Sequence, residues 1–548
     1  MNFEPLLPPE RRSAFKRMGF WRDQMLLHAL DAAAARTPDA PAIVDGNSVT
    51  GKRTVLTYGE LARRVENIAV GLARLGIERG DVVSYQLPNW WQFSALHLAC
   101  LRIGAATNAL MPIFRERELT FMLNLAESKV LIVPRRFRDF DYPAMAAGLR
   151  KSLPHLKAVV VVLGDGKDSF EELCTSTQAK PGEAAALFAQ RRLGPDDVIQ
   201  VIYTSGTTGE PKGAMHTSNT LFSNLTPYIE RLGLSSKDVV LMASPLAHQT
   251  GFLYGMMMPV QLGCPVVLQD IWNADRAAEL IAAEGVTFTM ASTPFLADLT
   301  DAAERKPEAF RSLRIFLSAG APIPRVLVRR AREHLGAHIV SAWGMTENGA
   351  VTTTRLDDPP EKVFETDGCP LPGMELRIVD AAGQPRPAGE EGRLQVRGCS
   401  NFVGYLKRPN LYGTDSEGWF DTGDLGRLDA DGYVRITGRS KDIVIRGGEN
   451  IPVVEIEGLL YKHAGVAEVA IVAMPDARLG ERACAFIVPK AGASLSLQDV
   501  AKFLQEQKVA KQYIPERVEL VPELPKTPSG KIQKFRLREI AKEFSAAG

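Results

Sequence analysis

The sequence predicts an α/β fold with largely parallel sheets, followed by a second, smaller domain of mixed α and β structure. Helix and strand patterns alternate through the first half of the chain, and a mixed pattern returns after Gly438. Between them, residues 374–436 form short alternating segments separated by Gly, Pro and Asp, which are typical of an antiparallel sheet or a small barrel. The length of 548 residues agrees, because a single hydrophobic core rarely grows beyond ~250–300 residues.

The first strong helix signal follows Thr57. Thr57 and Glu60 form a capping-box pattern, in which each side chain satisfies a free amide at the helix start. Apolar residues then recur at helical spacing up to Gly76, which ends the helix; they are Leu61, Val65, Ile68, Leu72 and Leu75. The next predicted elements, in order, are a strand at 82–87, a helix at 92–103 ended by Gly104, and buried strands at 130–133 and 158–163.

The last part of the chain is long enough for a domain of its own. Residues 455–460 and 499–505 have helical patterns, and residues 468–473 have a strand pattern. We therefore place an N-terminal domain at 1–438, a connection at 439–442 and a C-terminal domain at 443–548.

The composition is that of a globular protein, with 45% hydrophobic and 24% charged residues. The 65 basic and 64 acidic residues leave a formal net charge of +1, which argues against bulk electrostatic binding to nucleic acid or to an anionic lipid surface. The 6 cysteines are scattered without a CxxC pair, which disfavours a disulfide framework and a thiolate zinc site. Since a signal-peptide pattern and an apolar run of membrane-spanning length are both lacking, we expect a cytoplasmic monomer or homodimer without stable membrane insertion.

The most informative segment is a loop rich in glycine and hydroxyl groups. It reads Tyr203-Thr-Ser-Gly-Thr-Thr-Gly-Glu-Pro-Lys-Gly213 and follows the apolar strand residues 198–202. Glycines allow the backbone to approach a polyphosphate closely, amides and hydroxyls donate hydrogen bonds, and Lys212 adds positive charge. The spacing differs from GxxxxGK[ST], which disfavours a Walker-type NTPase. The alternative is an ordinary surface loop.

Together with further segments, this loop resembles the motifs of the adenylate-forming superfamily, which contains acyl-CoA synthetases, luciferases and adenylation domains of peptide synthetases. The other segments occur in the order expected for that superfamily and are Ser318–Pro322, Trp343–Glu347, Trp419–Asp424, Gly438–Asp442 and Pro525–Lys531. The resemblance implies a large N-terminal domain of two mixed α/β sheet subdomains plus a small β-barrel, and a smaller, mobile α+β C-terminal domain. It also implies a ligase that activates a carboxylate with ATP and transfers the acyl group to a thiol, with ATP, Mg²⁺ and CoA as cofactors.

The resemblance assigns phosphate and adenine contacts to two loops and one strand end. The β- and γ-phosphates would be held by Thr204, Ser205, Gly206, Thr207, Thr208, Gly209 and Lys212. The adenine side would be formed by Gly320, Ala321, Pro322, Trp343, Gly344 and Met345. Trp343 would stack on the adenine where most relatives carry Tyr, and its indole lacks that hydroxyl.

The remaining nucleotide contacts are polar side chains. Thr346 would bind the α-phosphate, and Glu347 would hold magnesium, a hard cation that prefers carboxylate oxygen. Asp424 would accept hydrogen bonds from both ribose hydroxyls, and Arg439 would reach the ribose or the α-phosphate. A surface carboxylate is the ordinary alternative for Asp424.

Lys531 would be the catalytic lysine of adenylate formation. It lies in a Pro/Thr/Ser/Gly loop, which is mobile by composition, and its ammonium would bridge the carboxylate and the α-phosphate. The superfamily then rotates its C-terminal domain about a hinge, here Lys441. After that rotation the turn with Arg446, Gly447 and Gly448 would face the adenylate, and its two glycines would leave room for the pantetheine arm of CoA; the alternative is an ordinary turn. A weaker alternative places the CoA phosphates on Lys534 and Arg536.

The acyl pocket is predicted around His248, at the position where relatives carry a His or aromatic gate. The following apolar run, residues 253–258, together with Gly344, Met345 and Val351, indicates a pocket for an uncharged acyl group. The chain most resembles bacterial short- to medium-chain fatty-acid and cyclohexanecarboxylate CoA ligases within the superfamily. We therefore expect an ATP-dependent carboxylic acid:CoA ligase for a short- or medium-chain fatty or alicyclic monocarboxylic acid.

Alternatives from other classes remain open. The first alternative transfers the acyl group to the thiol of a carrier protein. The second is a CoA ligase for an aryl acid. The third is a nucleotide-binding regulator without catalysis. Formation of acyl-CoA from acid, ATP and CoA would distinguish a CoA ligase from the first alternative. Release of pyrophosphate on adding an acid would exclude the third.

Overall fold

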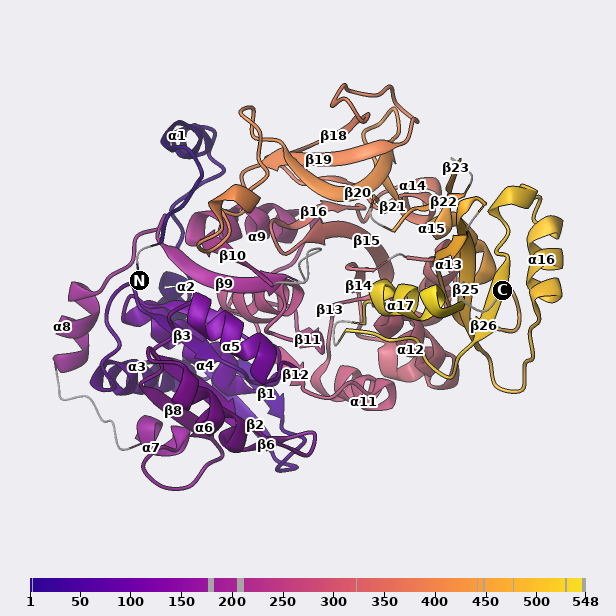
Figure 1. Cartoon of the computed structure of the whole chain (residues 1–548). Helices are drawn as coiled ribbons and strands as arrows, with labels where there is room; N and C mark the ends of the chain where they lie inside the picture. The colour runs from indigo at the N-terminus through magenta and orange to yellow at the C-terminus, as the bar shows by residue number, and fades with distance from the viewer. Residues whose placement is uncertain are drawn as a thin grey trace.

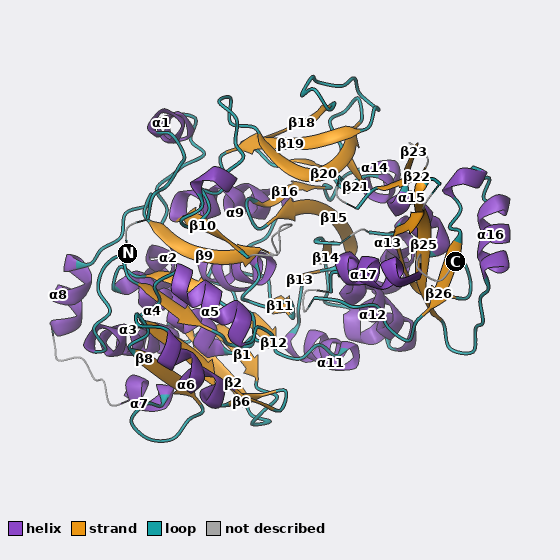
Figure 2. Ribbon diagram, in the orientation of Figure 1, coloured by secondary structure: helices purple, strands orange, loops and turns teal. Residues whose placement is uncertain are grey.

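The computed structural model describes residues 1, 3–175, 182–204, 211–321, 323–440, 442–446, 449–476, 478–527 and 530–544. A large N-terminal part contains a six-stranded and a nine-stranded sheet, and a four-stranded antiparallel sheet lies at its upper side in the view of Figure 1. A smaller C-terminal part, yellow in Figure 1, has a five-stranded sheet of its own. Figure 2 shows how helices and strands alternate, as the sequence predicts.

The six-stranded sheet has the order β10-β9-β4-β3-β5-β8, and its only antiparallel pair among the described residues is β9–β10. Its strands are β3 (Val82–Tyr85), β4 (Ala106–Ala109), β5 (Val130–Pro134), β8 (Ala158–Val162), β9 (Val198–Thr204) and β10 (Lys212–Thr217). The same half of the chain contains α1 (Pro9–Arg17), α2 (Leu26–Arg36), α3 (Tyr58–Arg74), α4 (Trp91–Arg102), α5 (Glu116–Leu125), α6 (Tyr142–Ser152), α7 (Phe170–Thr175), α8 (Glu183–Gln190) and the ribbon β6 (Arg136–Phe137) and β7 (Phe140–Asp141).

The nine-stranded sheet has the order β17-β16-β15-β14-β13-β11-β12-β1-β2 and is parallel from β15 to β1. Its strands are β1 (Pro41–Gly46), β2 (Arg53–Thr57), β11 (Val240–Met242), β12 (Val266–Gln269), β13 (Phe288–Ala291), β14 (Ile315–Ser318), β15 (His338–Met345), β16 (Gly349–Thr353) and β17 (Cys369–Pro370). The helices of this region are α9 (Ser218–Leu232), a π-helix η1 (Gly251–Met257), α10 (Met258–Leu262), α11 (Ala274–Glu284), α12 (Thr293–Arg305), the 3-10 turn η2 (Pro307–Phe310), α13 (Arg325–Leu335) and α14 (Pro360–Glu365).

Helix α4 lies in the interior of the N-terminal part. Its residues from Trp91 to Leu101 are all buried, and one hydrophobic cluster joins this helix to strands of both large sheets, for example through Val83, Leu96 and Phe288. A helix enclosed by packed layers is apolar on nearly all sides, which agrees with the sequence at 92–103.

Helix α3 begins at the predicted cap. The Oγ1 atom of Thr57 accepts a hydrogen bond from the backbone N–H of Glu60 at 3.2 Å, and the Thr57 N–H donates to Glu60 Oε2 at 3.0 Å. The capping box at this position is therefore confirmed.

Residues 374–439 form an open antiparallel sheet, and the expectation of a closed barrel was wrong. The strands β18 (Met374–Val379), β19 (Gly392–Gly398), β20 (Phe420–Leu428) and β21 (Val434–Arg439) pair in this order, so that β18 and β21 are its edges within the described residues. The 3-10 turn η3 (Pro409–Leu411) lies in the β19–β20 connection. An alternation of period two predicts half-buried strands, but closure depends on strand tilt and stagger, which that period does not specify.

The C-terminal part has a hydrophobic core of its own. Its strands β22 (Val444–Arg446), β23 (Glu449–Ile451), β24 (Val466–Asp476), β25 (Gly480–Pro489) and β26 (Arg517–Leu520) form one sheet. The helices are α15 (Val453–Leu460), α16 (Leu497–Glu506), the 3-10 turn η4 (Lys511–Tyr513) and α17 (Lys534–Phe544). Two hydrophobic clusters here use only residues between Val444 and Phe544, as expected for a separate domain. No helix in the described ranges has the length and apolar character needed to cross a bilayer.

A buried carboxyl group lies where β1 meets α4. Asp45 is 2% exposed, its Oδ2 accepts a hydrogen bond from the Trp91 N–H at 3.0 Å, and its Oδ1 has no hydrogen-bond partner. Burial raises the pKa of Asp45 to about 7, and the nearby charge of Asp270 also raises it. The folded protein therefore holds a proton here at a pH where the unfolded chain has lost it.

This carboxyl group predicts a pH-dependent effect of Asp45→Asn on stability. Because the folded pKa is raised, stability falls as pH increases from about 4 to about 7, by up to roughly 4 kcal/mol for a shift of this size. The amide has no charge to bury, so the variant should unfold at a higher temperature than the wild type at pH 8 and show a much smaller difference at pH 5. Thermal unfolding at both pH values checks this, and an equal shift at both would contradict it.

Candidate active site

Two adjacent strands carry the ends of the predicted phosphate loop. Thr204 at the end of β9 is the cross-strand partner of Lys212 at the start of β10. The loop residues Ser205, Gly206, Thr207, Thr208 and Gly209 lie outside the described residues. The structure thus places the two described ends of the motif side by side, where the loop between them connects antiparallel strands.

A buried carboxylate lies beside Lys212. Glu347 is 5% exposed, and the Tyr405 hydroxyl donates a hydrogen bond of 2.6 Å to its Oε1. The ammonium of Lys212 lies 5.2 Å from the centroid of the Tyr405 ring. Tyr405 reaches this position because residues 403–406 run alongside β10, with backbone hydrogen bonds such as Leu406 N–H to Gly213 O at 2.8 Å.

The pKa of Glu347 is shifted by its burial and by the groups around it. Burial raises the pKa of Glu347, while the hydrogen bond from Tyr405 and the charges of Lys212 and Arg439 act in the opposite direction. A cation brought to this carboxylate would favour its ionised form in the same way. Nearby positive charge thus favours the ionised form of Glu347, and its role as a magnesium ligand stays a prediction.

His216 is a residue that sequence reasoning missed. Its Nε2 lies 2.8 Å from the carbonyl oxygen of Thr346, to which it must donate, and its Nδ1 lies 3.2 Å from Thr220 Oγ1. Burial lowers the pKa of His216 to about 4, although the bond to Thr346 opposes this. The neutral ring thus holds the backbone between Thr346 and Glu347. A buried histidine within a strand gives no signal of this contact in sequence.

The segment from Trp343 to Met345 ends β15 and turns into β16. A Cβ atom on Gly344 would lie only 1.9 Å from the carbonyl oxygen of Gly349, so only glycine fits there. Trp343 is 8% exposed, and its backbone N–H lies 3.3 Å from Thr352 Oγ1. The close approach at Gly344 fixes the path of the chain from Trp343 to Glu347.

Asp424 and Arg439 come together as cross-strand partners of β20 and β21. The Arg439 Nε lies 2.8 Å from Asp424 Oδ1, and the indole Nε1 of Trp343 donates to Asp424 Oδ2 at 2.9 Å. Asp424 is 4% exposed. Three residues predicted to contact the nucleotide therefore touch one another across two different sheets.

The predicted adenine-side loop follows β14. Gly320 has a φ of +84°, which favours glycine, and Ala321 is partly exposed beside it. Pro322 lies outside the described residues. The loop leaves the carboxyl end of a parallel strand, where open α/β sheets usually bind their ligands.

Lys531 lies in a turn that contacts the nine-stranded sheet. The Thr527 N–H donates to the Lys531 carbonyl at 2.8 Å, and the Lys531 N–H donates to Thr527 Oγ1 at 3.1 Å. A Cβ atom on Gly530 would lie 2.6 Å from Ser292 Oγ, at the start of α12. A loop of the C-terminal part thus packs against the carboxyl end of β13.

His248 lies within the electrostatic influence of this loop. Burial lowers the pKa of His248 to about 4, and the charge of Lys531 lowers it further. The ring nitrogen Nδ1 lies 3.4 Å from the Thr250 N–H. The charge of Lys531 thus acts on His248, the predicted gate of the acyl pocket, although the two residues are far apart in the sequence.

The apolar run after His248 forms the π-helix η1, and its residues Gly251 to Met257 are all buried. Long π-helices are rare and occur mostly at functional sites. The Tyr254 hydroxyl donates to Asn224 Oδ1 at 2.7 Å and accepts from the Ala350 N–H at 2.9 Å. This run therefore adjoins the β15–β16 turn that follows Gly344, although the sequence pattern did not predict a π-helix.

The predicted hinge and CoA segment is only partly described. Lys441, Gly447 and Gly448 lie outside the described residues. The Arg446 Nε lies 2.6 Å from Glu516 Oε1, and the Arg538 guanidinium donates to Asp442 Oδ1 at 2.5 Å. In this conformation Arg446 is therefore held within the C-terminal part.

Lys534 is held in a similar way. Its ammonium donates to the buried Glu457 carboxylate at 2.6 Å, and its side chain is only 15% exposed. Removing it would leave a buried charge without its partner, so a role in the domain core fits Lys534 better than contact with the CoA phosphates.

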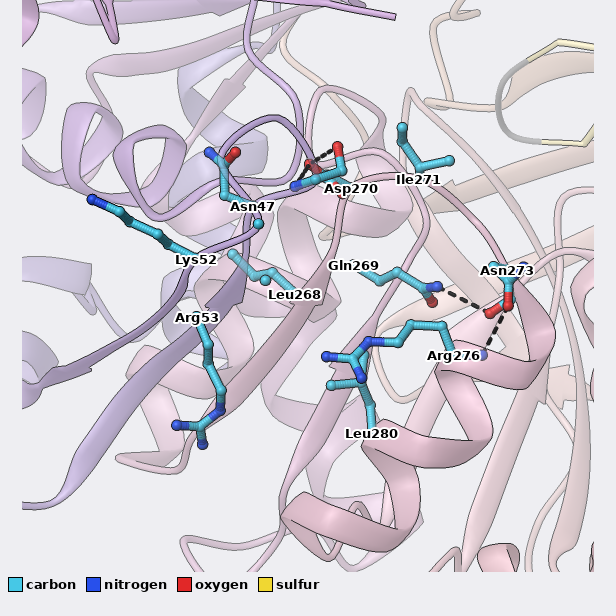
Figure 3. A pocket seen from close by; sticks show the side chains of 13 residues that line it. Asn47, Lys52, Arg53, Leu268, Gln269, Asp270, Ile271, Asn273, Arg276 and Leu280 are labelled. Carbon is cyan, nitrogen blue, oxygen red and sulfur yellow. Dashed lines mark hydrogen bonds between the residues drawn. The ribbon is translucent and has the colours of Figure 1, made fainter.

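A cavity of about 250 Å³ at the carboxyl ends of β1 and β12 contains none of the predicted site residues (Figure 3). Of its basic residues, Arg53 pairs with Glu284 at 2.8 Å and Arg276 with Glu279 at 2.9 Å, and Lys52 also lines the cavity. Asp270 accepts hydrogen bonds from the Ser48 N–H and hydroxyl at 3.0 and 2.8 Å.

Two family models and several known proteins match most of the chain. Residues 30–406 match the family model of the AMP-binding enzyme, and residues 455–531 match that of the AMP-binding enzyme C-terminal domain. The medium-chain fatty-acid–CoA ligase of Escherichia coli K12 is 37% identical over 535 residues, which cover 97% of this chain and 93% of that protein. The salicylyl-CoA synthase / salicylate adenylyltransferase of a Streptomyces species is 35% identical over 542 residues, with coverages of 98% and 97%. ATP-bound MatB from Rhodopseudomonas palustris is similar in structure, with a TM-score of 0.81, 27% identity, and coverage of 95% of this chain and 100% of that chain.

Proposed function

The chain belongs to the AMP-binding enzyme family and is an AMP-forming acyl-CoA synthetase, and we propose that its substrate is a short- or medium-chain fatty or alicyclic monocarboxylic acid. The observation that carries the proposal is the wholly buried run of η1 that follows His248. The Lys531 loop packs at Ser292, and the charge of Lys531 lowers the pKa of His248. An apolar wall beside a single lysine suits an acid with one carboxylate and an uncharged remainder. The 37% identity with a medium-chain fatty-acid–CoA ligase supports the same class.

The proposed reaction has two steps. The carboxylate oxygen attacks the α-phosphorus of ATP, the bond from that phosphorus to the bridging oxygen breaks, and diphosphate leaves. The CoA thiol then loses its proton and attacks the acyl carbonyl, and AMP leaves with the electron pair of the broken C–O bond. Phosphoryl chemistry of this kind depends mainly on positioning and charge neutralisation. Lys212 would neutralise the leaving phosphates, and Lys531 would hold the carboxylate against the α-phosphate.

Magnesium is proposed as a cofactor that Glu347 would hold. Within the described ranges no group of three or more His, Cys, Asp or Glu side chains is arranged to bind a metal by itself. Magnesium typically binds one or two carboxylates and completes its shell with substrate phosphates and water. A single buried Glu347 beside the phosphate loop fits that pattern, and the ion would offset phosphate charge there.

We propose the domain division 1–438, 439–442 and 443–548, with Lys441 as the pivot of a rotation between the two steps. The separate hydrophobic core of the C-terminal part supports a unit that can move as a whole. In this rotation the Lys531 loop would move away from the adenylate, and Arg446 with the following glycines would approach it. The pair between Arg446 and Glu516 lies within the moving unit and need not break for that rotation.

A second candidate substrate class is an aryl acid. The 35% identity with a salicylyl-CoA synthase over 98% of this chain favours it, because a flat ring is also an apolar acyl group. Transfer to a carrier-protein thiol is the corresponding alternative for the acceptor.

An acid panel tests the proposed function. Purified protein is mixed with ATP, Mg²⁺, CoA and C4–C10 fatty acids, cyclohexanecarboxylate, benzoate or salicylate, and acyl-CoA is identified by mass while diphosphate release is followed. We expect the highest kcat/KM among the fatty and alicyclic acids, by tenfold or more over aryl acids, since one methylene in an apolar pocket is worth roughly 10–200-fold. Higher values for salicylate would replace the proposal by the aryl-acid alternative, and diphosphate release without acyl-CoA would indicate a carrier-protein acceptor.

A further inference from the structure

The indole of Trp343 has a polar contact that adenine stacking does not require. Its Nε1–H donates to Asp424 Oδ2 at 2.9 Å, while Arg439 Nε lies 2.8 Å from the other carboxylate oxygen, Oδ1. Trp343 and Asp424 are 8% and 4% exposed. Oδ2 therefore accepts one hydrogen bond from the protein and Oδ1 has one ion-pair partner, which leaves a further lone pair on each oxygen for a ligand.

Two local irregularities bring these side chains together. The register of β15 and β16 shifts between Trp343 and Gly344, and that of β20 and β21 shifts between Leu425 and Gly426, next to Asp424. Such bulges bend a strand and redirect its side chains, and they are frequent beside active sites. The contact between Trp343 and Asp424 joins two different sheets, each with a bulge at that point.

The chemistry of the ring decides which residue can make this contact. A phenylalanine has the π-face of an aromatic ring but no donor, and a tyrosine carries its hydroxyl at the far end of the ring and not at the position of the indole N–H. A hydrogen bond to a buried carboxylate is charge-assisted and directional, so it fixes the orientation of the carboxylate plane. With Arg439 on the other oxygen, Asp424 is held from both sides.

We infer that Trp343 is a positioning residue for the ribose of the nucleotide and acts through Asp424 in addition to any stacking on the base. The inference rests on the proposed ATP site. The ligand chemistry is that of a vicinal diol, because the two oriented oxygens of Asp424 each keep one lone pair for a hydroxyl donor. Trp343 therefore contributes to selection for ribonucleotides.

The test combines Trp343→Phe with removal of the ribose hydroxyls. KM for ATP and for 2′,3′-dideoxyATP is measured by diphosphate release with the best acid of the panel. For ATP we expect the variant to raise KM roughly tenfold with little change in kcat, the loss typical of one hydrogen bond to a charged group. For dideoxyATP the variant and the wild type should differ by no more than about threefold, because the diol that Asp424 would bind is absent.

An equal rise in KM for both nucleotides would overturn the inference, since Trp343 would then act only on the base or on local structure. If Trp343→Phe folds poorly, the comparison moves to wild-type protein and Asp424→Asn. In that case the wild type must prefer ATP over dideoxyATP by tenfold or more. Asp424→Asn must lose most of this preference. An unchanged preference in Asp424→Asn would also overturn the inference. Calorimetric titration of the two nucleotides without an acid keeps this test separate from the proposed acid substrate.

Discussion

Lys531→Ala is expected to lower adenylate formation by a factor of about 10³ or more, because one preorganised charge at a reacting centre typically contributes roughly 10²–10³ and this lysine is predicted to contact both reactants. The Lys531 loop is the part of the C-terminal domain that packs against Ser292, and its charge reaches His248. Truncation at Cβ removes the ammonium without filling the space with another group. The release of diphosphate from acid and ATP measures this step.

The same variant should form thioester from a supplied acyl-adenylate at close to the wild-type rate. In the proposed rotation the Lys531 loop has left the adenylate when CoA reacts, so the second step does not use it. A matched control is Lys542→Ala, whose side chain is 59% exposed on α17. The control should retain both half-reactions within about twofold, as surface substitutions usually do. Equal losses of both half-reactions in Lys531→Ala would contradict the two-state mechanism.

Local patterns predicted the elements well where the signal lies within a few residues. The capping box at Thr57 and Glu60 appears as expected because both hydrogen bonds are made within one turn. Strand β5 is buried, as the apolar run at 130–133 predicts, whereas β8 forms at the second apolar run but is an edge strand with three half-buried residues, Ala158, Val159 and Val161. The prediction of a closed barrel was wrong because closure requires the edge strands β18 and β21 to pair, and these lie about 60 residues apart along the chain.

The candidate site shows the same division between local and distant information. The motif residues Asp424 and Arg439 were found from sequence, and the structure brings them into contact. Tyr405, which holds Glu347, and His216, which holds the Thr346 carbonyl, were missed. Their roles depend on contacts across 58 and 130 residues, which no periodic pattern encodes.

The charges of the C-terminal part were also incompletely predicted. Lys531 was predicted to contact the reactants, and Lys534 was an alternative contact for the CoA phosphates. Lys534 instead forms an ion pair with buried Glu457. A sequence gives the number of charges but not their partners, and partners decide whether a lysine is available to a ligand.

Asp424→Ala is expected to raise KM for ATP by a factor of about 10² or more, since hydrogen bonds to a charged acceptor are worth about 1.5–3 kcal/mol each and two are proposed to the ribose. The substitution also leaves the Trp343 N–H and the Arg439 guanidinium without the carboxylate that both contact. An unpaired buried donor adds to the loss, so the effect should exceed that of Trp343→Phe. KM for the acid should change far less, because Asp424 is predicted to touch only the nucleotide.

Asp421→Ala is the matched control for this substitution. Asp421 lies three positions earlier in the same strand and pairs with Arg393 at 2.9 Å, and its side chain is 34% exposed. A partly exposed ion pair contributes about 0–1 kcal/mol, so this variant should bind ATP within a factor of about five of the wild type. Steady-state diphosphate release at varied ATP and varied acid gives both KM values for each variant. The ribose assignment fails if Asp424→Ala binds ATP as the wild type does, or if Asp421→Ala weakens ATP binding to the same extent.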